Sequence, residues 1–302
     1  MYFQTIQGVM FAEACQKAMK FTRPVAVSTR LYDGTLNTDV GAMIVLNSDG
    51  WIITAGHMFD SFVKFQTDMK KMEEINNINA SRVQNPNAPS SEIKMDKTLI
   101  TNHSFWWGWD GVRINNVFVN RQADIAVGKL EPFDPKWIQE YPVFADPNHM
   151  RIGTSLCRGG YPFIKITPEF LQDKKAFRIP AIPSDTLFYP LEGIYSHLEN
   201  KGRTADGSCE MKYIETSSPG LKGQSGGPIF DVNGHIYGMQ VITDHRQLGF
   251  HPTAELDGQK YIENQFMNIG VGVHVSTIFE LLDARNIKYQ VEGDESGYHI
   301  IG

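Results

Sequence analysis

Short runs in which hydrophobic and polar residues alternate occupy most of the chain, and this is the pattern of β-strands. In the first half these runs predict strands at residues 25–31, 41–46, 51–54, 117–119 and 124–130. In the second half they predict strands at residues 152–162, 211–216, 228–232, 235–242 and 269–275. Residues 163–209 have a weak pattern, so we expect long loops and short strands there. The chain is therefore predicted to be mostly β.

Three segments have the spacing of amphipathic helices instead. Residues 11–20 predict a short N-terminal helix, and residues 59–78 predict a second one capped by Asp60 or Ser61. The second helix and the Asn/Pro/Ser-rich run that follows it to Ser91 interrupt the β pattern, so residues 60–95 are expected to be an insertion with an exposed loop. A third helix is predicted from residue 276 or 277 to about 285, with Thr277 and Glu280 spaced as a capping box.

The segment 105–110 is densely aromatic (FWWGWD). Aromatic runs of this kind form binding platforms for peptides or sugars in some proteins, but they pack in the core more often. We expect core packing here.

Composition and charge exclude several classes of function. The 302 residues are 41% hydrophobic and 21% charged, with a formal net charge of −6, so no basic surface for nucleic acid is indicated. The three cysteines, Cys15, Cys157 and Cys209, have neither disulfide-framework nor metal-ligand spacing, and no metal or cofactor is predicted. The N-terminus has no secretory leader pattern, and no apolar run approaches the ~20 residues of a membrane span. A cytoplasmic protein without membrane or nucleic-acid partners is expected.

The most unusual stretch is Gly223-Gln224-Ser225-Gly226-Gly227-Pro228. A serine among glycines, followed by a proline that cannot continue a helix, indicates either a nucleophile on a tight loop or an ordinary turn between strands. Two other polar residues stand beside apolar strands. His57 follows the predicted strand at 51–54, and Asp124 heads the strand of residues 124–130.

The order His57, Asp124, Ser225, each in its local sequence Thr-Ala-Gly-His, Ala-Asp-Ile-Ala and Gly-Gln-Ser-Gly-Gly-Pro, resembles the trypsin/chymotrypsin-like serine peptidases. The similarity covers the β-rich parts from about residue 24 to 285 and excludes the helical insertion. It implies an all-β fold of two six-stranded antiparallel β-barrels, with an N-terminal helix, a helical insertion and a C-terminal helix. The implied division is an N-terminal helical extension (1–22), a first barrel (23–135, with the insertion at about 60–95), a connector (136–150), and a second barrel with the closing helix (151–302).

The resemblance also implies a role for each residue. Ser225 is the implied nucleophile, His57 its general base and acid, and Asp124 the carboxylate that orients the imidazole. The backbone N–H groups of Gly223 and Ser225 are the implied oxyanion hole. A serine endopeptidase acting on a protein or peptide substrate follows as the expected function.

Gln224 separates the chain from the trypsinogen-like branch, which has an aspartate before the nucleophile to pair with a new N-terminal amine. The chain looks more similar to bacterial trypsin-like peptidases of the Deg/HtrA type, without a PDZ domain after the closing helix. Activation by N-terminal clipping is therefore not expected. Activation by a partner protein that orders the oxyanion loop is an open hypothesis.

The resemblance places the primary specificity pocket between residues 218–222, 241–243 and 271–274. No acidic residue stands where it would attract Lys or Arg, so trypsin-like specificity is not expected. Gln240 and His274 are candidates for the pocket floor, which would suit a polar or acidic side chain, although His274 is favoured as a core histidine. The candidate lining residues are Ser218, Lys222, Val241, Ile242, Thr243 and His274.

Two alternatives of other classes remain. The serine loop also satisfies Gly-x-Ser-x-Gly, the nucleophile elbow of α/β-hydrolase esterases, which needs a helix after the serine and a downstream histidine. Pro228 and the strand-like residues after it disfavour that helix, and the histidine would have to come from His235, His245, His251 or His274. The second alternative is a peptide-binding protein on an inactive peptidase fold.

Overall fold

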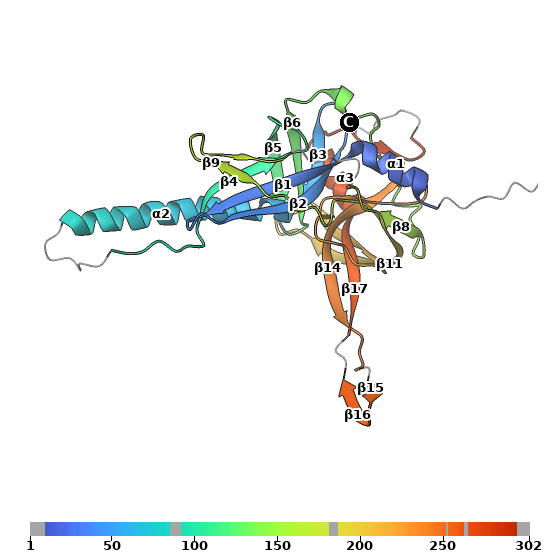
Figure 1. The fold of residues 1–302 in the computed structure, drawn as a ribbon. Helices are drawn as coiled ribbons and strands as arrows, with labels where there is room; N and C mark the ends of the chain where they lie inside the picture. The colour runs from blue at the N-terminus through green and yellow to red at the C-terminus, as the bar shows by residue number, and fades with distance from the viewer. Residues whose placement is uncertain (1–9, 85–91, 181–186, 252, 263–264, 295–302) are drawn as a thin grey trace, which may run out of the picture.

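The computed structural model describes residues 10–84, 92–180, 187–251, 253–262 and 265–294, and Figure 1 shows how its elements are arranged. Two large sheets, antiparallel except for two short strands of the second, contain most of the strand residues that the structure describes. The first sheet is six-stranded, and its buried residues, such as Val25, Ile44 and Ile53, are fully enclosed. Its strand order is β4 (Ile100–Trp106), β1 (Thr22–Leu31), β2 (Leu36–Val45), β3 (Trp51–Ala55), β6 (Ile125–Glu131) and β5 (Arg113–Asn120).

The second sheet closes on itself as a six-stranded ring. The ring runs through β13 (Pro228–Phe230), β8 (Ser155–Arg158), β11 (Leu191–Arg203), β12 (Glu210–Thr216), β17 (Phe266–His274) and β14 (Ile236–Gln247). The pairing of β14 with β13 completes it. Two short strands, β7 (Val143–Phe144) and β18 (Gln290–Val291), extend this sheet beyond β14 by parallel pairing. The predicted all-β class with two barrels is confirmed; the parallel additions, one of them inside the expected connector, were not anticipated.

The helices lie outside the barrels. They are α1 (Ala12–Phe21), the 3₁₀ turn η1 (Gly56–Phe59), α2 (Asp60–Gln84), η2 (Pro135–Trp137) and α3 (Val275–Asp283). The insertion helix α2 extends away from the rest of the molecule (Figure 1). It runs six residues beyond the predicted end at residue 78. Most of the loop expected to follow it, residues 85–91, lies outside the described residues.

The start of α3 differs from the prediction. The helix begins at Val275, and its cap is His274, whose Nδ1 accepts a hydrogen bond from the backbone N–H of Ser276 at 3.1 Å. The hydroxyl of Thr277 is buried and donates to the carbonyl oxygen of Glu210 at 2.6 Å. The predicted capping box of Thr277 and Glu280 is therefore wrong, because Thr277 faces the second barrel instead of the helix end.

The weak pattern of residues 163–209 hides the longest strand among the residues that the structure describes. β9 (Glu169–Leu171) and β10 (Ala176–Arg178) are short, as expected, but β11 has 13 residues. Only Gly193 and Tyr195 of β11 are buried, so the strand has no hydrophobic periodicity that a sequence reader could detect. Backbone pairing to β8 and β12 holds it in place.

The strands β14 and β17 continue beyond the barrel as a two-stranded arm. Their register runs unbroken from Ile242↔Val271 to Gln247↔Phe266. A small hairpin of β15 (Thr253–Leu256) and β16 (Gln259–Ile262) lies at the far end of this arm (Figure 1). The predicted strand at residues 235–242 therefore stops five residues short, because the outer residues of β14 are polar and exposed.

The aromatic segment packs in the core, as predicted. Trp107 is 1% exposed, and its ring lies 5.1 Å from that of Phe105 and 5.9 Å from that of Phe59. Trp109 stacks on Trp137 with ring centroids 5.1 Å apart. Because Phe59 ends the 3₁₀ turn that carries His57, this cluster fixes the base of α2 next to His57.

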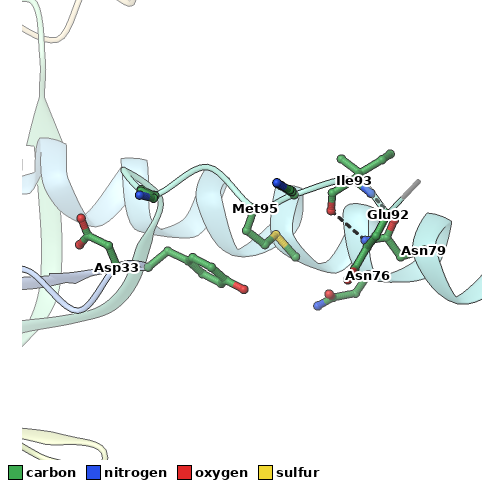
Figure 2. A pocket seen from close by; sticks show the side chains of 9 residues that line it. Asp33, Asn76, Asn79, Glu92, Ile93 and Met95 are labelled. Atoms are coloured by element: carbon green, nitrogen blue, oxygen red, sulfur yellow. Dashed lines mark hydrogen bonds between the residues drawn. The ribbon is translucent and has the colours of Figure 1, made fainter. Parts of the chain in front are cut away.

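A cavity of about 370 Å³ lies along the insertion, between α2 and the returning residues 92–97 (Figure 2). The amide of Asn79 closes one end by exchanging two hydrogen bonds, each 2.9 Å long, with the backbone of Ile93. None of the predicted site residues lines this cavity. Among the residues described, no helix has both the length and the apolar character needed to cross a bilayer.

Replacing Trp107 should destabilise the fold without altering any polar group near His57. We expect Trp107→Ala to lower the free energy of unfolding by about 3–5 kcal/mol, because truncating a buried aromatic residue leaves a cavity. Val83→Ala is the matched control, since Val83 is 88% exposed on α2, and it should change stability by less than about 0.5 kcal/mol. Urea unfolding followed by tryptophan fluorescence and circular dichroism measures both. Equal stability of the two variants would contradict this packing.

Candidate active site

Strand pairing in the first barrel brings His57 and Asp124 together. Ala55, the last residue of β3, pairs with Ile125, the first residue of β6. His57 follows Ala55 by two residues, and Asp124 directly precedes Ile125. The Nδ1 atom of His57 lies 2.9 Å from Oδ2 and 3.2 Å from Oδ1 of Asp124. The backbone N–H of His57 also donates to Oδ1 at 2.7 Å. One carboxylate thus fixes both the backbone and the ring of His57.

Asp124 adopts an unfavourable backbone conformation to make these contacts. Its φ of +54° lies in the left-handed region, which few residues other than glycine adopt at no cost. Such strain costs of order 1–3 kcal/mol and persists only where the surrounding structure enforces it. Here the two hydrogen bonds to His57 and the strand that starts at Ile125 do so.

The carboxylate changes the proton affinity of the imidazole. The hydrogen bond that the ring of His57 donates to Asp124 raises the pKa of His57 above its ordinary value of 6.5, and this outweighs the opposite effect of burial. The carboxylates of Asp124 and Asp60 add smaller coulombic contributions in the same direction. The ring is therefore a stronger base than a free histidine.

The loop that carries Ser225 is anchored to both barrels. The carbonyl oxygen of Ser225 accepts from the N–H of Ala42 in β2 at 2.7 Å, and the N–H of Gly226 donates to Gln240 in β14 at 2.8 Å. Gly223 has a φ of +102°, and a Cβ there would lie 2.4 Å from the carbonyl oxygen of Tyr161. Only glycine fits this position without displacing backbone.

Gln224 stabilises the loop from inside. Its side chain is fully buried, its Oε1 accepts from the N–H of Leu221 at 2.9 Å, and its Nε2 donates to the carbonyl oxygen of Tyr189 at 3.2 Å. These contacts are made within the second half of the chain. They hold the side chain of Gln224, the residue before the serine, and no terminal amine takes part in them.

The backbone N–H groups of Gly223 and Ser225 make no hydrogen bond within the described residues. Both residues line a cavity of about 260 Å³ together with His57. Two unpaired N–H groups beside a serine are the arrangement that a developing oxyanion requires.

The cavity draws its walls from both halves of the chain. Val27, Val40 and Met58 make it apolar, while charged and polar residues stand at its rim. Across the rim, Lys222 forms an ion pair with Asp39 at 2.7 Å. The rim residues are Asp39, Asp60, Ser61 and Lys222.

Ser225 and His57 share this cavity without a direct hydrogen bond in the described structure. The Oγ of Ser225 donates instead to the carbonyl oxygen of Val241 at 3.3 Å. Unliganded active sites often have long catalytic contacts that tighten when substrate binds.

The other predicted lining residues divide into two groups. Val241, Ile242 and Thr243 lie on β14 next to the serine loop, and the hydroxyl of Thr243 donates to the carbonyl oxygen of Gly220 at 2.6 Å. Lys222 lines the cavity with Ser225, whereas Ser218 is not among the residues that line it. His274 is not brought into the site: it caps α3, and burial lowers its pKa to about 4. The interpretation of His274 as a core histidine is the better one.

Sequence reasoning missed a second serine–histidine pair. The Oγ of Ser61, at the cavity rim, lies 3.0 Å from Nε2 of His103 in β4. Burial lowers the pKa of His103 to about 4, and its ring stacks on Phe65. The sequence offered no signal for this pair, because β4 itself was not predicted and Ser61 was considered only as a helix cap.

The six-stranded first sheet and the closed second barrel form a trypsin-like serine peptidase fold, in which the His57–Asp124 pair and Ser225 share one cavity. The chain belongs to the trypsin-like peptidase domain family, whose model matches residues 41–239. That match includes His57, Asp124 and Ser225.

Several solved structures are similar in fold. The active form of the Rv3671c protease from M. tuberculosis is 11% identical over 98% of this chain and 89% of that chain, with a TM-score of 0.48. An inactive mutant form of the same protein is 11% identical over 91% of both chains, with a TM-score of 0.45. The HtrA-type protease AlgW with a tripeptide is 13% identical over 91% of this chain and 63% of that chain, also with a TM-score of 0.45. Among curated proteins, none matches the sequence.

Because the ring of His57 donates a hydrogen bond to Asp124, we expect a raised pKa for His57 that depends on this carboxylate. NMR titration of the wild-type protein should give His57 a pKa above 6.5, and Asp124→Asn should lower it, because the charged acceptor that favours the imidazolium is lost. His103 serves as the internal control and should stay near 4 in both proteins. An unchanged His57 pKa in Asp124→Asn would contradict the geometry.

Proposed function

We propose that the protein is a serine endopeptidase that cleaves peptide bonds through an acyl-enzyme on Ser225. The observation that carries the proposal is the Asp124-oriented His57 in one cavity with Ser225 and two unpartnered backbone N–H groups. No other serine among the described residues has all of these neighbours.

Each group has one task in the proposed reaction. His57 Nε2 takes the proton of the Ser225 hydroxyl as the oxygen attacks the substrate carbonyl, and later gives that proton to the leaving amine. Asp124 stays ionised, fixes the tautomer with the proton on Nδ1, and stabilises the imidazolium. The N–H groups of Gly223 and Ser225 stabilise the oxyanion, and loss of one such donor costs about 3–4 kcal/mol. Water then attacks the ester, with His57 as the base again.

Cleavage within a chain is favoured because the site continues on both sides of Ser225. Strand β14 leads away from the serine on one side, and the cavity rimmed by Asp39, Asp60 and Lys222 lies on the side of His57. A leaving amine protonated by His57 would lie in that cavity. The polypeptide after the scissile bond therefore has a place of its own.

The Ser61–His103 pair is a weaker candidate for the nucleophile. The ring of His103 has a pKa of about 4, so it is a poor base near neutral pH, and no carboxylate among the described residues orients it. Its surroundings are aromatic rings. We assign Ser61 no chemical role.

The alternatives from the sequence lose support. The esterase hypothesis needs a helix after the serine, but residues Pro228–Phe230 form strand β13. The inactive and partner-activated hypotheses are disfavoured by the unpartnered N–H groups of Gly223 and Ser225, which fit an oxyanion hole that is already formed. The expected cytoplasmic location stays a prediction.

Labelling by a fluorophosphonate probe tests the proposed nucleophile. We expect a stoichiometric adduct on Ser225, located by peptide mass spectrometry, no adduct in Ser225→Ala, and a strongly reduced rate in His57→Ala. Ser81→Ala is the control, since Ser81 lies exposed on α2, and it should label like the wild type. Labelling that survives in Ser225→Ala and disappears in Ser61→Ala would move the nucleophile to the other pair.

The labelling rate should also depend on pH in a defined direction. Neutral His57 is the active base, so the rate rises with pH through a pKa above 6.5. In Asp124→Asn the midpoint should move to lower pH, while the plateau falls by about 10⁴-fold because the imidazole adopts the wrong tautomer. A pH profile of labelling rates measures both effects. A normal plateau in Asp124→Asn would show that another carboxylate orients the ring.

A further inference from the structure

A buried arginine without an anionic partner lies inside the second barrel. Arg158, the last residue of β8, is 1% exposed, and its Nη2 donates to the hydroxyl of Thr216 in β12. Within the residues that the structure describes, its Nε and Nη1 atoms are buried and have no hydrogen-bond partner. Two of its three nitrogen atoms therefore keep their donor capacity unused.

No carboxylate of the described structure neutralises this guanidinium. Glu215, the buried acid next to Thr216, is engaged elsewhere: its Oε2 accepts from Nη1 of Arg246 at 3.0 Å and lies 3.5 Å from Nδ1 of His197. Burial lowers the pKa of Arg158 to about 10, so the group still carries its charge at neutral pH. An unpaired buried charge costs several kcal/mol, which an anion arriving at this position would offset.

The guanidinium of Arg158 packs close to the chain segment 218–222, which leads to Ser225. A Cβ on Gly270 in β17 would lie only 1.7 Å from Nη1 of Arg158, so the arginine packs directly against this glycine. The N–H of Gly270 donates to the carbonyl oxygen of Ser218 at 2.9 Å. Ser218 begins the segment that continues through Lys222 to the Ser225 loop, so the charge of Arg158 lies near the start of this segment.

Strand β14 contacts the same segment from another side. In the β14–β17 register, Thr243 lies opposite Gly270, and Gln240 lies opposite Gly272. Gln240 also approaches Gly220, where a Cβ would lie 2.2 Å from its Nε2. Gln240 thus packs on the segment that Ser218 begins, and Arg158 packs on the glycine whose N–H binds Ser218.

Two more buried polar atoms, one on this segment and one on β14, have no hydrogen-bond partner among the described residues. Among the described residues, the Oγ of Ser218 and the Oε1 of Gln240 have no partner, while the Nε2 of Gln240 donates to the carbonyl oxygen of Ile242 at 2.8 Å. A carboxylate can accept several hydrogen bonds, and Arg158 Nε, Arg158 Nη1 and the Ser218 hydroxyl are unused donors. This donor set suits a carboxylate better than a cation or an apolar group.

We propose that Arg158 forms the base of the primary specificity pocket and that the enzyme cleaves after aspartate or glutamate. The inference rests on the proposed peptidase function and names the substrate class of that site. The hydrogen bond from the Thr243 hydroxyl to the carbonyl oxygen of Gly220 joins β14 to the segment 218–222, so an entering side chain replaces this contact. Because Gly220 and Gly270 carry no side chains, the Nε2 of Gln240 and the Nη1 of Arg158 pack directly against them.

Peptide cleavage by the full-length protein tests the inference. A set of fluorogenic peptides differs only in the residue before the scissile bond, which is Glu, Asp, Gln, Asn, Leu or Lys. We expect kcat/KM for Glu or Asp to exceed that of the matching amide by at least about 30-fold, because an unmet buried charge costs 2 kcal/mol or more. Equal rates for acid and amide, or a preference for Leu or Lys, would overturn the proposal.

Variants assign that preference to Arg158. Arg158→Gln should remove the discrimination between acid and amide, and Arg158→Lys should keep part of it. Arg151→Gln, at an exposed arginine just before β8, is the matched control and should keep all of it. Fluorophosphonate labelling of Ser225 in each variant reports whether the catalytic groups are still in place. An Arg158→Gln protein that labels normally and still prefers Glu would refute the assignment.

A binding measurement separates this inference from the proposed chemistry. In the Ser225→Ala background, fluorescence anisotropy compares labelled peptides that contain Glu or Gln at the tested position. The Glu peptide should bind at least about 30-fold more tightly, and Arg158→Gln should abolish the difference. If wild-type Ser225 failed to label while this difference persisted, the peptidase function would fall and the carboxylate site would stand. Equal binding of the two peptides would remove the site.

Discussion

The hydrogen bonds that hold the Ser225 loop between the two barrels are the contacts on which the site depends. Ala42 of the first barrel and Gln240 of the second bind the carbonyl oxygen of Ser225 and the N–H of Gly226, which belong to the same peptide unit. His57 and Asp124 belong to the first barrel, while Ser225 and its N–H groups belong to the second. The nucleophile and its base are therefore aligned only when both barrels are folded and in contact.

Two charged groups, Asp124 beside His57 and the buried Arg158, are treated in opposite ways by this architecture. Asp124 is fully engaged with the ring and backbone of His57, and this interaction raises the pKa of the histidine. Arg158 keeps two nitrogen atoms unused in an interior position. The first charge is compensated within the protein and tunes the proposed base. The second is compensated by the substrate in our account, so stability is given up for recognition.

The sequence predicted the elements that carry local signals. Glycines around Ser225, a histidine after β3 and an acid before β6 mark their positions by residue type, and alternation marks the buried strands. Two features had no such signal. β11 is mostly exposed on both faces, and Arg158 stands among buried residues as one charge whose partners, Thr216 and Gly270, come from distant strands. Only the folded barrel brings them together.

A crystal structure of the protein treated with a peptidyl phosphonate that carries a glutamate side chain would test the central claim most directly. We predict a covalent bond from phosphorus to Ser225 Oγ, a phosphonyl oxygen between the N–H groups of Gly223 and Ser225, and the carboxylate in hydrogen-bond contact with Arg158. An adduct on another residue, or a carboxylate that points to solvent with Arg158 still unpaired, would contradict the account.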